Sequence, residues 1–215
     1  MSFDFIAAGQ EVIATEQAAL ETLKPFINES FQQACQLILA CTGRVVVMGM
    51  GKSGHIGNKI AATLASTGTP AFFVHPAEAS HGDLGMITPN DVVIAISNSG
   101  ETVEVVAFAQ LVKSWGNKVI AITGKSGSAL AKSADAVLDI TFEKEADPNG
   151  LAPTTSTTLT IALGDALRAT RCQEAMNILN LGNVSKISPL IRRSFGMWLK
   201  CRVLLKTSMP CNNSS

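Results

Sequence analysis

The stretch Ser-Asn-Ser-Gly-Glu-Thr, residues 97–102, directly follows the apolar run Asp-Val-Val-Ile-Ala-Ile at 91–96. The apolar run predicts a buried strand, and the small polar residues after it predict a turn into a helix. Such a turn is an anion cradle, because the free backbone N–H groups and the positive dipole end of the helix face it. The stretch therefore indicates an α/β fold with an anion site at one edge of its sheet.

Hydroxyl side chains strengthen this prediction. Ser97, Ser99 and Thr102 each add a donor. Gly100 permits close backbone approach to a ligand. No lysine or arginine occurs between positions 59 and 113, so the cradle would hold its ligand by dipoles and hydroxyls. We therefore expect a phosphate monoester here.

Apolar runs rich in β-branched residues alternate with helical patterns along the chain. The predicted strands are residues 44–48, 70–74, 91–96, 118–123 and 136–140. The predicted helices are residues 5–40, interrupted at Pro25, then 54–66, 102–115, 128–133 and 156–167. Residues 75–85 are predicted to be a polar loop. This alternation predicts a three-layer α/β domain, a doubly wound five-stranded parallel sheet with an N-terminal helical extension.

Composition narrows the classes of function. The chain has 215 residues, of which 47% are hydrophobic and 16% charged, and its formal net charge is +0. This length supports one substantial core, and the charge balance predicts neither nucleic-acid nor membrane partners. The N-terminus lacks a signal-peptide pattern, and five cysteines without a CxxC pair favour free thiols in a reducing cytoplasm.

The charge is unevenly distributed along the chain. Residues 168–215 hold eight Lys/Arg, one acidic residue and three of the five cysteines. We therefore expect three parts: N-terminal helices at 1–40 that pack on the domain, the α/β domain itself at 41–167, and a divergent basic tail at 168–215.

The segment 49–54, Gly-Met-Gly-Lys-Ser-Gly, fits the spacing of a dinucleotide-binding turn between a strand and a helix. That class usually carries an acidic residue at the end of the second strand, and here the strand ends in His75. A nucleoside-triphosphate loop needs a glycine where Val46 stands. Nicotinamide binding is therefore disfavoured, but the polar residues of this segment still predict a ligand site beside the 97–102 turn.

Four further segments carry a family resemblance. They are Gly-Lys-Ser-Gly-His-Ile-Gly at 51–57, Ser-Thr-Gly-Thr-Pro at 66–70, His-Pro-Ala-Glu-Ala-Ser-His-Gly-Asp-Leu-Gly at 75–85 and Leu-Ala-Pro-Thr-Thr-Ser-Thr-Thr at 151–158. With the 97–102 turn, they resemble the arabinose 5-phosphate isomerase family of sugar isomerase (SIS) domains, from about residue 5 to Leu167. The resemblance implies a flavodoxin-like SIS fold and an aldose–ketose isomerase that supplies the Kdo pathway of lipopolysaccharide. It also implies no cofactor and a homo-oligomer, a dimer or tetramer, built through the N-terminal helices.

The resemblance assigns roles to individual residues. Lys52, Glu104 and Glu145 match catalytic positions of the family. The matching substrate and phosphate contacts are Ser53, Gly68, Thr69, His75, His81, Ser97, Ser99 and Thr102. The family position that matches His75 can take an inhibitory zinc, although the spacing of the two loop histidines fits no common zinc pattern by itself.

Interconversion of an aldose and a ketose phosphate requires ring opening, then proton transfer between C2 and C1 through a cis-enediol. A carboxylate suits the proton transfer, and a cation suits the developing oxyanion. We expect Lys52 to stabilise the oxyanion and either Glu104 or Glu145 to move the proton; the sequence leaves this choice open. Glu101 and Glu104 are three residues apart and are predicted to share a face of one helix, where an exposed glutamate often serves only the helix dipole.

The resemblance ends near Leu167. The family's fourth catalytic residue is a histidine in a Ser-His-Pro-Gly-Gly run after the last helix, whereas this chain has no histidine beyond His81. We interpret residues 168–215 as read in a shifted frame and expect no CBS domains; a genuine basic arm, with an amphipathic helix at 197–205, is the alternative. The isomerase activity would then be impaired. A catalytically silent phosphosugar-binding regulatory module is the rival function.

Overall fold

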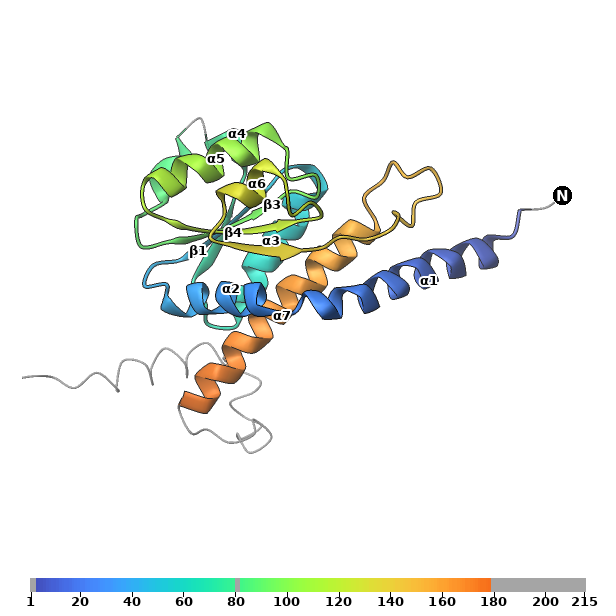
Figure 1. Ribbon diagram of the computed structural model, residues 1–215, viewed down its shortest axis with the longest axis horizontal. Helices are drawn as coiled ribbons and strands as arrows, with labels where there is room; N and C mark the ends of the chain where they lie inside the picture. Colours follow the sequence, from blue (N-terminus) through green and yellow to red (C-terminus); the bar gives the residue numbers. More distant parts are fainter. Residues whose placement is uncertain (1–2, 80–81, 179–215) are drawn as a thin grey trace, which may run out of the picture.

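A five-stranded parallel sheet forms the centre of the protein (Figure 1). The structure, a computed structural model, describes residues 3–79 and 82–178, with side chains as far as residue 169. The strands are β1 (Val45–Gly49), β2 (Ala71–Val74), β3 (Val92–Ile96), β4 (Lys118–Thr123) and β5 (Ala136–Asp139). They lie in the order β2-β1-β3-β4-β5, and each neighbouring pair is parallel. The predicted doubly wound sheet is confirmed, with every strand within one residue of its predicted bounds.

Helices cover both faces of this sheet (Figure 1). One face carries α1 (Phe5–Leu23), α2 (Glu29–Ala40), α3 (Gly51–Ser66) and α7 (Thr155–Ile178). The other face carries α4 (Pro76–Ala79), α5 (Val103–Ser114) and α6 (Ala129–Ser133). Along β1, Val45 and Val47 join the first buried cluster, whereas Val46 and Met48 join the second. Because successive side chains of a strand point to opposite faces, a continuous apolar run fits a sheet that is covered on both sides.

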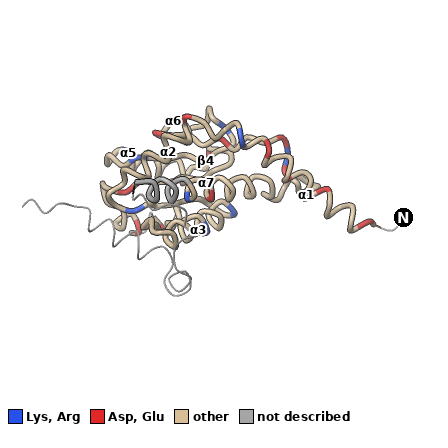
Figure 2. The backbone as a smooth tube through the Cα atoms, turned by 90° about the horizontal axis from the view of Figure 1, so that it is seen from below, with Lys and Arg blue, Asp and Glu red and all other residues tan. Residues whose placement is uncertain are grey.

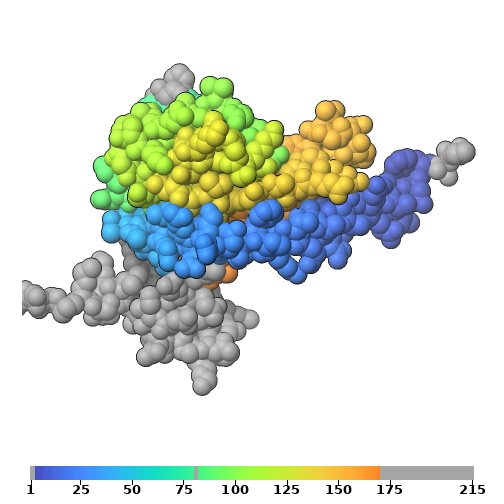
Figure 3. Space-filling view, viewed as in Figure 1, coloured from blue at the N-terminus to red at the C-terminus, as the bar shows by residue number. Residues whose placement is uncertain are grey.

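Pro25 separates the two N-terminal helices. It lies in a short 3-10 helix, Lys24–Phe26, because a proline has no N–H to donate within a continuous helix. Asp4 caps α1 and Asn28 caps α2, each by accepting hydrogen bonds from first-turn N–H groups. The predicted break is confirmed. The N-terminal half of α1 projects beyond the rest of the described protein (Figure 3).

A buried carboxylate ties β1 to β3 at their amino ends. Asp91 is only 2% exposed and accepts hydrogen bonds from the N–H groups of Arg44 (2.6 Å) and Thr88 (2.8 Å). The Arg44 guanidinium lies 3.7 Å from this carboxylate and 4.4 Å from the ring centroid of Phe72 on β2. These contacts hold three neighbouring strands together, so the turns that follow β1 and β3 also lie side by side.

The predicted loop at 75–85 is wrong in part. It contains the single helical turn α4 and a 3-10 turn, Asp83–Met86. The carbonyl oxygen of His75 accepts from the N–H groups of Glu78 and Ala79, and this pairing starts α4. Short helices of this kind satisfy backbone groups locally, and hydrophobic periodicity does not reveal them.

α7 is longer than predicted. The helix continues past Leu167 to Ile178, because residues 168–178 contain neither glycine nor proline to end it. The frame-shift hypothesis for 168–215 and the alternative helix at 197–205 concern sequence that lies mostly outside the described residues. Both stay predictions.

Charges are interspersed along the described backbone, where acidic and basic positions are mixed (Figure 2). The described residues hold all 17 acidic residues but only 11 of the 17 basic residues, because the other six lie in 179–215. Among the helices of the described ranges, none combines the length and apolar character needed to cross a membrane.

Candidate active site at the carboxyl edge of the sheet

β1 and β3 are neighbours, but the chain leaves them in opposite directions, towards β2 and towards β4. Ligands bind at such a reversal of strand order in open α/β sheets, outside the carboxyl ends of the strands. A cavity of about 450 Å³ lies there. Residues of three segments line it: the turn after β1, the turn after β3, and the loop between β5 and α7.

Three hydroxyls converge in the turn after β3. Ser97 Oγ lies 2.9 Å from Thr102 Oγ1 and 3.4 Å from Ser99 Oγ, and all three residues line the cavity. Thr102 is the N-cap of α5, but its side chain makes no capping hydrogen bond. The first N–H groups of α5 and the three hydroxyls are therefore available together to an anion.

Gly100 fixes the shape of this turn. Its φ is +66°, and a Cβ at this position would lie 2.0 Å from Ser128 Oγ and 2.8 Å from Thr123 Oγ1. Its N–H donates to Ser97 Oγ at 3.1 Å, and its carbonyl accepts from the N–H of Leu130 at 3.0 Å. Only glycine combines this left-handed conformation with such close packing.

The turn after β1 is shaped by close packing of α3 on the strand. A Cβ on Gly54 would lie 2.7 Å from the carbonyl oxygen of Gly49, so the glycine spacing lets the helix start directly against β1. Met50, the N-cap, makes no side-chain capping hydrogen bond. Lys52 and Ser53 lie on the first turn of α3 and line the cavity, where Lys52 is the only basic residue among the described residues of the lining.

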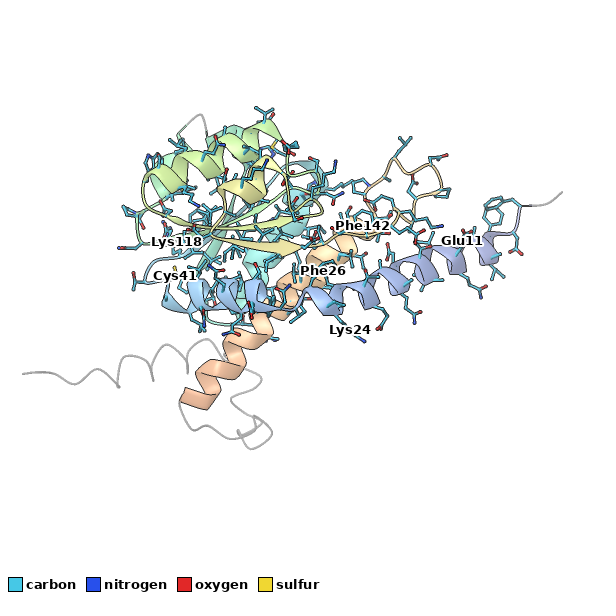
Figure 4. All side chains as sticks on the ribbon, viewed as in Figure 1. Glu11, Lys24, Phe26, Cys41, Lys118 and Phe142 are labelled. Carbon is cyan, nitrogen blue, oxygen red and sulfur yellow. The ribbon has the colours of Figure 1, made fainter. Side chains whose placement is uncertain are left out.

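The loop after β5 brings a carboxylate to the same cavity; Figure 4 labels Phe142 where this loop begins. Glu145 Oε2 accepts hydrogen bonds from the N–H groups of Thr154 (2.8 Å) and Ser156 (3.2 Å) and from Thr154 Oγ1 (3.2 Å). These groups form the start of α7. The carboxylate thus caps α7 from within the chain, and its negative charge faces the positive end of the helix dipole.

Asp147 folds the same loop back on itself. Its Oδ2 accepts hydrogen bonds from the N–H groups of Leu151 (2.8 Å) and Ala152 (3.2 Å). These bonds, first that of Leu151 and then that of Ala152, stabilise the ionised form and hold the pKa of Asp147 below its usual range. Gly150, at φ +64°, provides the turn that brings the two N–H groups back.

Six of the predicted site residues line this one cavity: Lys52, Ser53, Ser97, Ser99, Thr102 and Glu145. Glu104 does not line it: this residue lies on the first turn of α5, and its side chain is exposed outside the cavity. The prediction that Glu101 and Glu104 share a helix face is wrong. α5 begins only at Val103, and Glu101 Oε1 accepts instead from the N–H of Ala129 at the start of α6, at 3.0 Å.

The remaining predicted contacts lie elsewhere. Gly68 and Thr69 precede β2 and therefore lie at the amino edge of the sheet, opposite the cavity. His75 follows β2 at the carboxyl edge, outside the lining, and its buried Nδ1 has no hydrogen-bond partner in residues 3–79 and 82–178. His81 lies outside the described residues. No group of three His, Cys, Asp or Glu side chains gathers as a metal site in the described ranges, so zinc at His75 stays a prediction.

Two residues of this site are not among the predicted ones. Thr154 and Ser156 hold the Glu145 carboxylate, and Ser156 also lines the cavity. A signal was present, because a cluster of serine and threonine before an apolar helical pattern is typical of a helix N-terminus. The identity of the carboxylate that such an N-terminus holds depends on the tertiary fold.

The fold and the site define a doubly wound α/β protein with an anion cradle at the point where its strand order reverses. The chain belongs to the SIS domain family, whose sequence profile matches residues 38–169. This finding agrees with the family resemblance of the sequence.

Two curated relatives and one solved structure specify the similarity. The arabinose 5-phosphate isomerase KdsD of Escherichia coli K12 is 58% identical over 165 residues, which are 77% of this chain and 50% of that protein. The KdsD of Pseudomonas aeruginosa PAO1 is 58% identical over 166 residues, 77% of this chain and 51% of that protein. An E. coli CFT073 protein, solved in complex with arabinose 5-phosphate, is 43% identical with a TM-score of 0.76 and covers 81% of this chain and 93% of that chain. The chain spans about half the length of the curated relatives it matches.

Proposed function

We propose that this chain is an aldose–ketose isomerase that interconverts D-ribulose 5-phosphate and D-arabinose 5-phosphate, in the cytoplasm, as a supplier of the Kdo pathway. One observation carries the proposal: a hydroxyl-lined anion cradle, the basic Lys52 and the carboxylate of Glu145 line a single cavity. The identity to KdsD over the same residues supports the choice of substrate.

In the proposed mechanism, the cradle at Ser97, Ser99 and Thr102 holds the phosphate and so fixes the distance to the reacting carbons. Ribulose 5-phosphate is open-chain, because its O5 carries the phosphate. The Glu145 carboxylate takes a proton from C1 of this ketose. The electron pair forms the cis-enediol(ate), and Lys52 stabilises the oxyanion at the former carbonyl. A proton then passes from O1 to O2, and the proton held by Glu145 returns to C2, which gives the open-chain aldose. No net atoms or electrons are therefore exchanged with the protein.

The test is turnover of ribulose 5-phosphate to arabinose 5-phosphate by the 215-residue chain, with chelator present and Glu145→Gln as the control. Turnover that the variant loses supports the isomerase. Binding of arabinose 5-phosphate without turnover indicates instead the silent phosphosugar-binding module. The missing turnover would then follow from the position of Glu104 outside the cavity and from the absence of a histidine after His81. A chain that shows neither turnover nor binding would overturn both functions.

We further propose that α1 joins two copies of the chain. Phe5, Ile6 and Ile13 are 80%, 75% and 65% exposed, and they border a groove on α1. They belong to the half of the helix that projects from the described protein (Figure 3). Apolar side chains this exposed mark an interaction surface, and a partner helix of the same kind would cover them. Ile6→Glu with Ile13→Glu should lower the mass measured by light scattering, whereas Glu11→Gln, at an exposed position of α1 outside this groove, should not. An unchanged mass in the double variant would contradict this proposal.

A further inference from the structure

Thr154 stands where the loop after β5 meets α7, and its hydroxyl is a branching point of hydrogen bonds. Thr154 Oγ1 accepts from the N–H of Ala146 at 2.9 Å and from the N–H of Asp147 at 3.2 Å. A hydroxyl has two lone pairs and one proton. Because both lone pairs face N–H groups, the proton is directed to the remaining neighbour, Glu145 Oε2, at 3.2 Å.

Glu145 is thereby held by one oxygen only. Oε2 receives the Thr154 hydroxyl and the N–H groups of Thr154 and Ser156, all from the start of α7. Among the described residues, Oε1 of Glu145 takes part in no hydrogen bond, and the residue lines the cavity. The carboxylate therefore has an anchored oxygen and an oxygen left for a ligand. Charge-assisted bonds of this kind are the stronger class and fix geometry as well as charge.

We propose that Thr154 is a positioning residue for Glu145: its hydroxyl locks one carboxylate oxygen to the N-terminus of α7 and leaves the other aimed at the substrate. This inference rests on the proposed isomerase function and deepens it. It also separates the two glutamates, because the exposed Glu104 has no hydrogen bond among the described residues that could orient it in the same way.

Thr157 provides a matched comparison one helical turn later. Its hydroxyl donates to the carbonyl oxygen of Thr154 at 2.8 Å, an ordinary bond within the helix, and it does not line the cavity. Replacing either threonine by valine keeps the shape of the side chain and removes only the hydroxyl. Thr154 also keeps its own N–H bond to Glu145 in such a variant.

The experiment compares Thr154→Val, Thr154→Ser and Thr157→Val by steady-state kinetics with ribulose 5-phosphate. Loss of a hydrogen bond to a charged group should lower kcat of Thr154→Val by about 10- to 100-fold while KM stays within about twofold, since the phosphate cradle is intact. Thr154→Ser should restore most of kcat, and Thr157→Val should match the parent chain. A Thr154→Val variant with the parent kcat, or a serine variant as impaired as the valine one, would overturn the proposal.

A second readout does not depend on turnover. Amide hydrogen exchange, followed by NMR, should be about tenfold or more faster at Ser156 in Thr154→Val, because the anchored carboxylate loosens. The exchange rate in Thr154→Ser and Thr157→Val should stay as in the parent chain. If the parent chain has no isomerase activity but these rates differ as stated, the proposed function fails while the positioning of Glu145 stands. Equal exchange rates at Ser156 in all four proteins would remove the positioning role.

Discussion

Three helix N-termini lie at the cavity, those of α3, α5 and α7. The N–H groups of the last two are satisfied in opposite ways. At α5, the N-cap Thr102 makes no capping bond with its side chain, and its hydroxyl joins those of Ser97 and Ser99. At α7, the Glu145 carboxylate already occupies the corresponding position, through three hydrogen bonds. Both ends carry the same dipole and the same orphan N–H groups. One is therefore suited to an external anion, whereas the other orients an anion of the chain itself.

The difference follows from the residues that each turn places nearby. The turn after β3 holds one carboxylate, Glu101, and this side chain accepts from the N–H of Ala129 at α6 instead of capping α5. The loop before α7 is longer, and Asp147 folds it back on itself. This fold carries Glu145 to the N-terminus of α7. Loop geometry thus decides whether a helix end binds a ligand or positions a side chain.

Removing the internal anion should have the largest effect. Glu145→Gln should lower kcat by about 10²- to 10⁴-fold, the range of a general acid–base group, and should leave the binding of arabinose 5-phosphate in place. Glu143→Gln, an exposed carboxylate of the same loop, is the control and should match the parent chain. Glu104→Gln should lower kcat less than Glu145→Gln does in the same steady-state assay. A larger loss of kcat in Glu104→Gln than in Glu145→Gln would assign the proton transfer to Glu104 and refute the contrast between the N-termini of α5 and α7.

Distorting the open end should come next. Gly100→Ala forces an L-residue into φ +66° and places its Cβ 2.0 Å from Ser128 Oγ. The strain and overlap should lower the free energy of unfolding by about 3 kcal/mol. Urea denaturation measures this loss. Gly127→Ala is the control, because a Cβ there would meet nothing within 4 Å; equal stability of the two variants would show that the turn can relax.

Removing one hydroxyl of the cradle should have a smaller effect, which is measured as ligand binding. Ser97→Ala should weaken the binding of arabinose 5-phosphate by about tenfold, since a hydrogen bond to a charged group contributes about 1.5–3 kcal/mol and neighbouring donors compensate in part. Calorimetric titration gives the dissociation constant. Ser114→Ala, at the other end of α5, should bind as the parent chain does. An unchanged constant for Ser97→Ala would place the phosphate elsewhere.

The smallest effect concerns pH. Because the folded pKa of Asp147 lies below its ordinary value of 3.8, its ionised form stabilises the loop above that pH, and the contribution is lost as the pH falls through the folded pKa. As the pH falls from about 5 to strongly acidic values, the free energy of unfolding of the parent chain should therefore decrease slightly more than that of Asp147→Asn. The difference should be small, because solvent screens an accessible carboxylate. Parallel denaturation curves of both proteins across this range would contradict the role of the Leu151 and Ala152 bonds.

Much of the fold could be predicted because its signals are local. The continuous apolar runs of β1, β3 and β4 give both strand position and burial on two faces, and Pro25 marks the break between α1 and α2. The turn at 97–102 carries its hydroxyls within six residues, so their convergence in one turn could be predicted before any fold was known. Their binding of an anion stays a prediction. The helical turns in 75–85 and the continuation of α7 past Leu167 were less accessible, because short helices leave no periodic pattern and helix bounds carry weaker signals than helix interiors.

The sequence by itself therefore determined the parallel sheet, the family and the hydroxyl-rich turn after β3. Only the tertiary structure decided which glutamate lies in the cavity, because that depends on where the loop after β5 folds back against α7. It also separated Gly68 and Thr69 from the lining, since they precede β2 rather than follow it. A motif fixes only how far apart its residues lie along the chain, whereas a site requires that their side chains meet in one cavity of the folded protein.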